Sequence, residues 1–191
     1  MLRHKKPVGQ RVAIIGAGGI GFDVAEYLVT DGESVTEDLQ AWLDEWGVVS
    51  PAEARGGLQT MPNPVVQHAA KREVYLMQRS AGKLGAKLGK TTGWIHRLTL
   101  RKAGVKMFGG LSYEEVNGNG LLVRYEDNGN TEQLEVDNVI LCAGQLPRRD
   151  LYDEIKSRDK VPVYVIGGAD VAAELDAKRA INQGTRLAAT L

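Results

Sequence analysis

This sequence has one cysteine and three histidines, which leaves little material for a metal centre. Cys142 alone can form neither an intrachain disulfide nor a thiolate cluster for zinc or an iron–sulfur centre. The histidines, at positions 4, 68 and 96, are too scattered to predict a ligand set. We therefore expect no metal site and no Ser-His-Asp triad here. Because Cys142 lies in an apolar run, we expect a buried core residue rather than a nucleophile.

Excess charge of one sign and long apolar runs are also missing. Lysine plus arginine number 24 and so do aspartate plus glutamate, so no net field favours nucleic acid or an anionic membrane. No apolar run approaches the ~20 residues of a membrane-spanning helix, and residues 1–7 lack the apolar stretch of a signal peptide. We expect a globular, cytoplasmic protein that binds neither nucleic acid nor membrane.

Glycine, by contrast, is abundant and patterned. Residues 11–15 predict a buried parallel strand and residues 20–30 predict a helix. Between them, Gly16, Gly18 and Gly21 form the pattern G-x-G-x-x-G, which permits a tight turn, close approach of a pyrophosphate, and close helix–strand packing, respectively. The helix N-terminus then offers free N–H groups to the phosphates.

The loop therefore predicts a dinucleotide site, the alternative being a glycine turn without a ligand. Its predicted binding residues are Gly16, Ala17, Gly18, Gly19, Ile20 and Gly21.

The second strand decides which nucleotide is expected. An acid at its end would bind the ribose 2′-hydroxyl of NAD. Glu37 and Asp38 stand at the usual spacing but begin a predicted helix, whereas treating residues 33–72 as an insertion ends the second strand at Arg79. A guanidinium there favours the 2′-phosphate of NADPH, supported by nearby Lys90 and two further lysines, Lys83 and Lys87. The alternatives are a solvated basic loop or the phosphates of a coenzyme A substrate.

Spacing and turn residues predict the remaining elements. Ser34 and Glu37 suggest a capping box for a helix over 35–46, whose Trp42 and Trp46 we expect in the core. The apolar positions expected to bury the first helix are Ile20, Val24, Tyr27 and Leu28. The further predicted strands are 73–79, 105–108, 112–116, 120–125, 132–136, a buried 137–143, and 161–166; the further helices are 92–102 and 171–190, with a helix or loop over 148–159.

Four motifs in order give the chain a family resemblance. It resembles the C-terminal part of the bacterial 2,4-dienoyl-CoA reductases, within the Old-Yellow-Enzyme-related iron–sulfur flavoproteins that include trimethylamine dehydrogenase. The resemblance runs over nearly the whole chain. The residues that carry it are Val12–Gly16 with Gly18–Asp23, Leu88–Arg97, Val139–Gln145, and Ile166–Ala172 with Glu174–Ala177.

The resemblance implies an enzyme in three parts. An N-terminal barrel holds FMN and the substrate site, a [4Fe–4S] cluster follows, and a C-terminal pair of nucleotide domains holds FAD and NADPH. Hydride passes from NADPH to FAD, then single electrons pass through the cluster to FMN, and hydride reaches the dienoyl-CoA. Because the barrel, the cysteine set and an earlier FAD glycine motif are missing, we expect a fragment without catalytic residues.

The resemblance also implies a domain division. Residues 1–144 would be a Rossmann-like α/β domain of the glutathione-reductase NADPH type, and residues 145–191 a βα tail from the adjoining FAD domain. Gly144, Gly168 and Asp170 would then contact FAD, with Asp170 near the ribityl chain; by itself this stretch is only a glycine turn capped by Asp170. Two functional alternatives stay open: a related enoate reductase or amine dehydrogenase, and a structural ADP-binding module.

Overall fold

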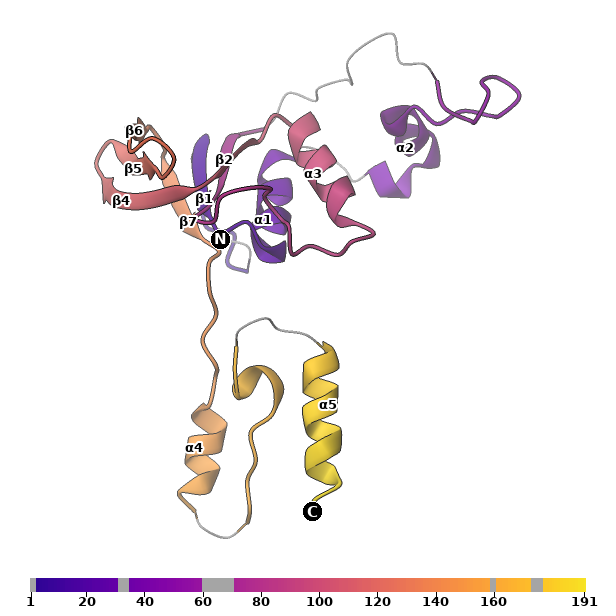
Figure 1. Ribbon diagram of the computed structural model, residues 1–191. Helices are drawn as coiled ribbons and strands as arrows, with labels where there is room; N and C mark the ends of the chain where they lie inside the picture. Colours follow the sequence, from indigo (N-terminus) through magenta and orange to yellow (C-terminus); the bar gives the residue numbers. More distant parts are fainter. Residues whose placement is uncertain (1–2, 31–34, 60–70, 159–160, 173–176) are drawn as a thin grey trace. The chain divides into compact units, whose positions relative to one another are not determined.

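The computed structural model describes residues 3–30, 35–59, 71–158, 161–172 and 177–191. It divides into two compact units, Met1–Ala143 and Gly144–Leu191. Figure 1 shows the sheets and three helices in the first unit, and two helices joined by an irregular segment in the second.

A parallel sheet of four strands forms the centre of the first unit. Its strands are β1 (Arg11–Ile15), β2 (Glu73–Gln78), β3 (Lys106–Gly109) and β7 (Asn138–Leu141), in the order β3-β2-β1-β7. β1 pairs in parallel with β2 on one side and β7 on the other. The strand order therefore reverses direction beside β1, and the predicted α/β, Rossmann-like fold class is confirmed.

Helices α1 (Gly19–Val29) and α3 (Gly93–Lys102) cover one face of this sheet. Alternate strand residues such as Val12 and Ile14 point to them, and the cluster is completed chiefly by Phe22, Val24, Leu28, Val74, Leu76 and Leu100. The predicted apolar face of α1 is only half right. Val24 and Leu28 are buried, but Ile20 and Tyr27 are 52% and 55% exposed, because the buried face of the helix extends the other way around it, over Phe22, Ala25 and Val29.

Three antiparallel strands provide the core on the other face. These are β4 (Leu111–Asn117), β5 (Gly120–Tyr125) and β6 (Thr131–Leu134), close to the predicted ranges. Their inward residues pack with Ala13 and Met77, the strand positions that alternate with those of the first cluster. The hairpin between β4 and β5 turns at Asn117-Gly118, where the Asn119 N–H donates to Asn117 Oδ1 at 2.9 Å.

Strand β7 is not buried as predicted. It is the edge strand of the parallel sheet, and Leu141 at its end is 75% exposed. Cys142 is correspondingly half-buried against the first cluster rather than fully enclosed. An apolar run fits a central strand and an edge strand equally well, so only the strand order decides how much of it is covered.

The inserted segment contains a short 3₁₀ turn, η1 (Val35–Glu37), and helix α2 (Leu39–Trp46). The helix is capped by Asp38, whose Oδ1 accepts the Ala41 N–H at 3.0 Å; the predicted cap, Ser34, lies outside the described residues. The prediction that Trp42 and Trp46 are core residues is wrong. α2 has no buried residue, because it does not pack against the sheet.

The second unit contains α4 (Asp150–Lys156), a 3₁₀ turn η2 (Gly167–Ala169) and α5 (Ala177–Ala188). Residues 161–166 are predicted as a strand but form none, since the described residues of this unit contain no second strand to pair with them. The last helix was predicted from 171, yet 171 and 172 are not helical.

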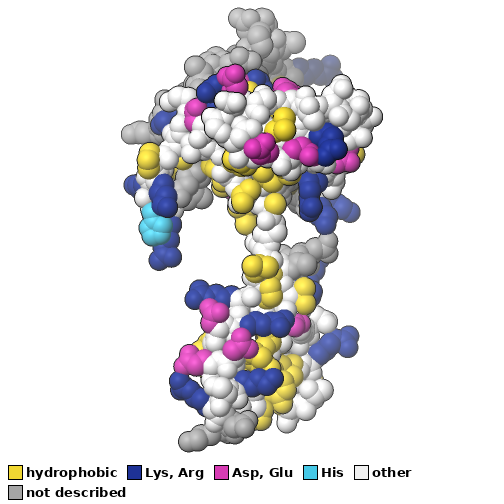
Figure 2. Space-filling model, turned by 90° about the vertical axis from the view of Figure 1, so that its left-hand side faces the viewer, with side chains coloured by type: hydrophobic (Ala, Val, Ile, Leu, Met, Phe, Trp, Pro, Cys, Tyr) yellow, Lys and Arg dark blue, Asp and Glu magenta, His cyan; other side chains and the backbone are white. Residues whose placement is uncertain are grey.

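Apolar side chains are plentiful at the surface of this unit (Figure 2). Leu146, Leu151, Val161 and Ile181 are each more than 60% exposed. Among the residues that the structure describes, no helix is both long and apolar enough to cross a membrane.

Candidate functional site

The glycine loop leaves β1 in a conformation that only glycine adopts easily. Gly16 has φ +114°, and a Cβ there would lie 2.6 Å from the backbone carbon and oxygen of Cys142. Its N–H donates to the carbonyl of Met77 at 2.8 Å, which ties the turn to β2. Gly16 is therefore fixed by the packing of its own chain.

The other loop glycines divide into a packed one and two open ones. A Cβ on Gly21 would lie 1.8 Å from the carbonyl oxygen of Gly16, so this glycine allows α1 to pack against the turn. Gly18 and Gly19 have no atom within 4 Å of a Cβ, and Gly18 is the N-cap of α1 without a side-chain cap. Open space thus faces the N-terminal N–H groups of α1, and the loop fits a pyrophosphate.

Two further predicted loop residues differ in exposure. Ala17 is 9% exposed and belongs to the first core cluster, so its side chain serves packing and only its backbone could meet a ligand. Ile20, in the first turn of α1, is 52% exposed. An apolar side chain at the helix N-terminus therefore borders the open space above Gly18 and Gly19.

The loop lies where open α/β sheets bind ligands. β1 and β7 end in register, with Ile15 opposite Leu141. The strands that follow β1 in the chain, β2 and β3, lie on the side of β1 away from β7, so the strand order reverses between β1 and β7. Ligands of such sheets bind outside the carboxyl ends of the strands at this reversal. The glycine loop and the residues that follow β2 both occupy this edge.

Arg79 directly follows β2, whose Met77 is opposite Ile15 of β1. Its side chain is exposed and makes no hydrogen bond or ion pair with another described residue, which leaves the guanidinium available to an anion. Burial raises the pKa of Tyr113 to about 12, and the positive charge of Arg79 opposes this rise. The Tyr113 hydroxyl is buried without a hydrogen-bond partner in the described part of the chain.

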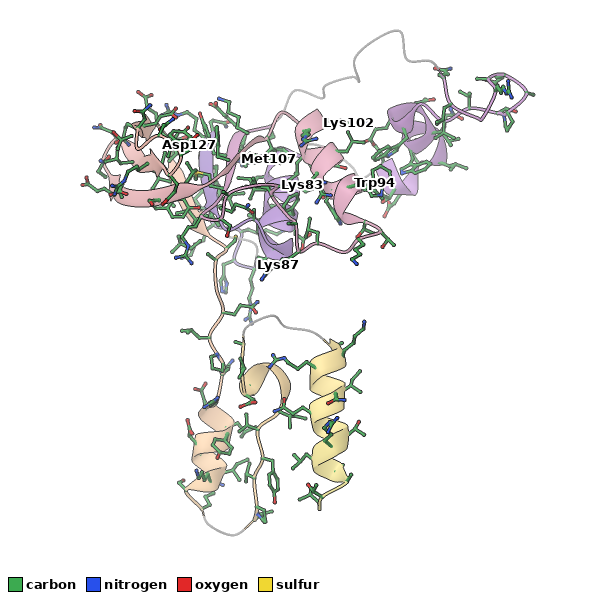
Figure 3. The ribbon with its side chains drawn as sticks, viewed as in Figure 1. Lys83, Lys87, Trp94, Lys102, Met107 and Asp127 are labelled. Atoms are coloured by element: carbon green, nitrogen blue, oxygen red, sulfur yellow. The ribbon has the colours of Figure 1, made fainter. Side chains whose placement is uncertain are left out.

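The lysine-bearing loop after Arg79 is anchored by its apolar residues. Leu84 is 8% exposed within the first core cluster, and a Cβ on Gly85 would meet the Phe22 ring at 2.8 Å. Arg97 on α3 donates to the Gly85 carbonyl at 3.1 Å. The charged residues Lys83 and Lys87 are exposed on this anchored backbone (Figure 3). Lys90 is exposed as well.

Helix α3 begins at the predicted place, without a side-chain cap at its N-terminus. Thr92 is its N-cap and makes no side-chain hydrogen bond; instead the Gly93 N–H donates to the Gly89 carbonyl at 2.7 Å. His96 lies 3.7 Å from Glu26 of α1, so it links the two helices. Asp38 caps α2 and takes no part in the nucleotide site.

Asp170, the predicted flavin contact in the second unit, binds side chains of its own unit. The Asp170 carboxylate accepts the Gln183 amide at 2.8 Å and lies 3.7 Å from the Arg149 guanidinium. Gln183 also accepts the Gly167 N–H, at 2.8 Å. Asp170 caps the glycine turn, as predicted, through its backbone N–H, which donates to the Gly167 carbonyl at 3.2 Å. Its carboxylate is held by α5 and by Arg149 at the start of α4, so it does not present a free carboxylate to a ribityl chain.

Two further predicted flavin contacts are glycines. Gly144 has φ +74° with open space around it, and Gly168 lies half-buried in η2. Arg149 and Gln183 were not predicted. No local pattern marks them, because they reach the turn from 20 and 13 residues away.

Comparison with known proteins gives one family match over most of the chain. The model of the pyridine nucleotide-disulphide oxidoreductase family matches residues 1–176. A curated relative, described as a metal reductase of Desulforamulus reducens, is 25% identical over 169 residues, which cover 88% of this chain and 23% of that protein.

Two solved structures share the fold. A 2-naphthoyl-CoA reductase complex has a TM-score of 0.64 at 19% identity, covering 97% of this chain and 22% of that one. Histamine dehydrogenase from Rhizobium sp. 4-9 has a TM-score of 0.64 at 16% identity, covering 98% and 24%. The chain thus spans about a quarter of the length of each of these three proteins.

Proposed function

Because the chain belongs to the pyridine nucleotide-disulphide oxidoreductase family, we propose that it binds NADPH at the glycine loop, as the electron-entry part of a 2,4-dienoyl-CoA reductase. The observation that carries the NADPH site is the open space over Gly18 and Gly19, between the packed Gly16 and Gly21. A loop that only turned the chain would need the packed glycines but not the open ones.

Each part of the site has a role in this proposal. The backbone at Gly18 and Gly19 and the N-terminus of α1 hold the pyrophosphate, while Ile20 borders it. Arg79 binds the 2′-phosphate with two N–H groups, and Lys90 adds positive charge from the loop that follows Arg79. The availability of the Arg79 guanidinium supports NADPH over NADH and over a structural ADP.

NADPH supplies a hydride when it is bound, and FAD is the proposed acceptor. The chain itself orients the nicotinamide by fixing the pyrophosphate and the adenosine half. No residue of this chain is assigned a proton-transfer or covalent role. FMN, a [4Fe–4S] cluster and the barrel that binds dienoyl-CoA belong, in this proposal, to the rest of a longer polypeptide.

We assign residues 1–144 to the NADPH domain and residues 145–191 to the FAD domain. The division of the structure after Ala143 supports this boundary. Gly144, Gly168 and Asp170 remain the proposed flavin contacts. For Asp170 to take this role, its ion pair with Arg149 and its bond to Gln183 would have to be exchanged for contacts with the ribityl chain.

The substrate of the parent enzyme rests on the motif resemblance. The similarity to a structure described as a 2-naphthoyl-CoA reductase complex supports a parent that acts on a coenzyme A thioester. A related amine dehydrogenase is the second candidate, favoured by the equally similar fold of histamine dehydrogenase.

Calorimetric titration of the whole chain with NADPH, NADH, ADP and FAD tests the NADPH site. We expect NADPH to bind more tightly than NADH or ADP. The variant Arg79→Ala should weaken NADPH about tenfold and leave NADH unchanged, since only NADPH has the 2′-phosphate. Arg101→Ala, an exposed arginine in the last turn of α3, is the matched control. Equal affinity for NADPH and NADH would contradict the role of Arg79.

A further inference from the structure

The inserted segment 35–59 exposes an apolar surface that the nucleotide site does not use. None of its side chains belongs to either core cluster. Leu39 is 73% exposed, Leu58 is 60% exposed and Trp42 is 39% exposed. We call Leu39, Trp42, Trp46 and Leu58 the α2 surface. Tryptophan is enriched at protein interfaces, and exposed tryptophan on a helix therefore indicates a contact surface.

The α2 surface is presented by a locally stabilised helix. Asp38 caps its start, and Gly47, in the left-handed conformation, ends it. The rings of Trp42 and Trp46 lie 6.4 Å apart, and Lys102 of α3 lies 4.3 Å from the centre of the Trp46 ring. In Figure 1, α3 lies between the parallel sheet and α2. The helix is thus tied to the first unit through its last residue, while Leu39 and Trp42 face outward.

Charge identifies the class of partner. The sequence over 35–59 contains five acidic residues, Glu37, Asp38, Asp44, Glu45 and Glu53, and one basic residue, Arg55, so one minus five gives the segment a net charge of −4, in a chain whose total net charge is zero. Two copies of this surface facing each other would therefore repel. A basic partner would be attracted, and its apolar side chains would cover Leu39 and Trp42.

We propose that the α2 surface binds a basic segment of a partner protein that inserts an aliphatic or aromatic side chain between Leu39 and Trp42. The position of the α2 surface lets a partner bind while the nucleotide site is occupied. α1 ends at Val29 and β2 begins at Glu73, so the insertion belongs to the amino edge of the sheet, opposite the glycine loop. A partner bound there leaves the carboxyl edge open.

A synthetic 14-residue peptide of lysine and leucine at helical spacing is the probe, with its glutamate–leucine counterpart as control. The chain has three tryptophans, two of them on this surface, so we expect the peptide to change tryptophan fluorescence and its affinity to fall with added salt. Trp42→Ala should weaken binding about tenfold. The control Val116→Ala removes an apolar side chain of β4 that is exposed too, at 65%, and it should not change the affinity for the peptide.

Further variants keep the proposal falsifiable. Leu39→Ser should weaken binding even if Trp42→Ala proves unstable, and Glu53→Lys should weaken binding mainly at low salt. Equal binding of the acidic peptide, or equal losses in Trp42→Ala and Val116→Ala, would overturn the proposal. So would salt-insensitive dimerisation in sedimentation that Trp42→Ala abolishes, since a second copy would then be the occupant. NADPH titration of Trp42→Ala should be unchanged, which separates this surface from the proposed function.

Discussion

Substituting alanine at each of the three loop glycines should separate ligand binding from packing. Gly18 has φ −86° and ψ −175°, a conformation open to any residue, and its Cβ would meet nothing within 4 Å. Alanine is a poorer N-cap than glycine, but it also restricts the unfolded chain. These effects oppose each other, so Gly18→Ala should change the free energy of unfolding by less than about 1 kcal/mol.

The packed glycines should behave in the opposite way. A Cβ at Gly21 would lie 1.8 Å from the Gly16 carbonyl oxygen, so the helix or the turn must move. Overpacking typically costs about 1–3 kcal/mol, and we expect the upper end of that range here because the atom that the Cβ meets belongs to the backbone. At Gly16, alanine meets the Cys142 backbone at 2.6 Å and also adopts φ +114°, which alone costs about 1–3 kcal/mol. Both variants should lose stability.

The assay pairs urea unfolding, followed by circular dichroism, with calorimetric titration of NADPH. Gly18→Ala should unfold like the parent chain and yet bind NADPH at least about tenfold more weakly, because the methyl group occupies the space of the pyrophosphate. If Gly18→Ala binds NADPH as tightly as the parent chain, no pyrophosphate approaches Gly18. If Gly21→Ala is as stable as the parent, the packing argument fails.

Two titratable groups give further predictions. The Arg11 backbone N–H, at 2.8 Å, and then its guanidinium hold the pKa of Asp137 below its ordinary value of 3.8. A lowered pKa in the folded state stabilises the fold above pH 3.8, and this contribution is lost as the pH falls. The urea midpoint should therefore fall more steeply on acidification for the parent than for Asp137→Asn; parallel curves would contradict the assignment. Burial raises the pKa of Cys142, so its thiol should react with Ellman's reagent more slowly than free cysteine at the same pH and equally fast after unfolding. An equally fast reaction in the folded chain would show the thiol to be exposed.

Local patterns determined much of the first unit. The run before Gly16, the spacing of the three glycines and the strand patterns over 112–116, 120–125 and 132–136 depend on neighbours within a few residues, and the structure forms β1, α1 and the antiparallel strands close to the predicted ranges. Composition alone shows that the chain has one cysteine and three histidines, and so few residues that could act as metal ligands or nucleophiles. Binding by the loop residues, Arg79 and Lys90 stays a prediction.

Tertiary structure decided which elements are covered and which side chains are free. The same apolar pattern describes a core strand and β7 at the edge, or a core helix and the exposed α2, because periodicity records one face but not what lies against it. Residues 161–166 have the composition of a strand, yet a strand requires a neighbouring strand for its backbone hydrogen bonds. The open space at Gly18, the available guanidinium of Arg79 and the occupied carboxylate of Asp170 all depend on residues distant in sequence, so only the folded chain distinguishes them.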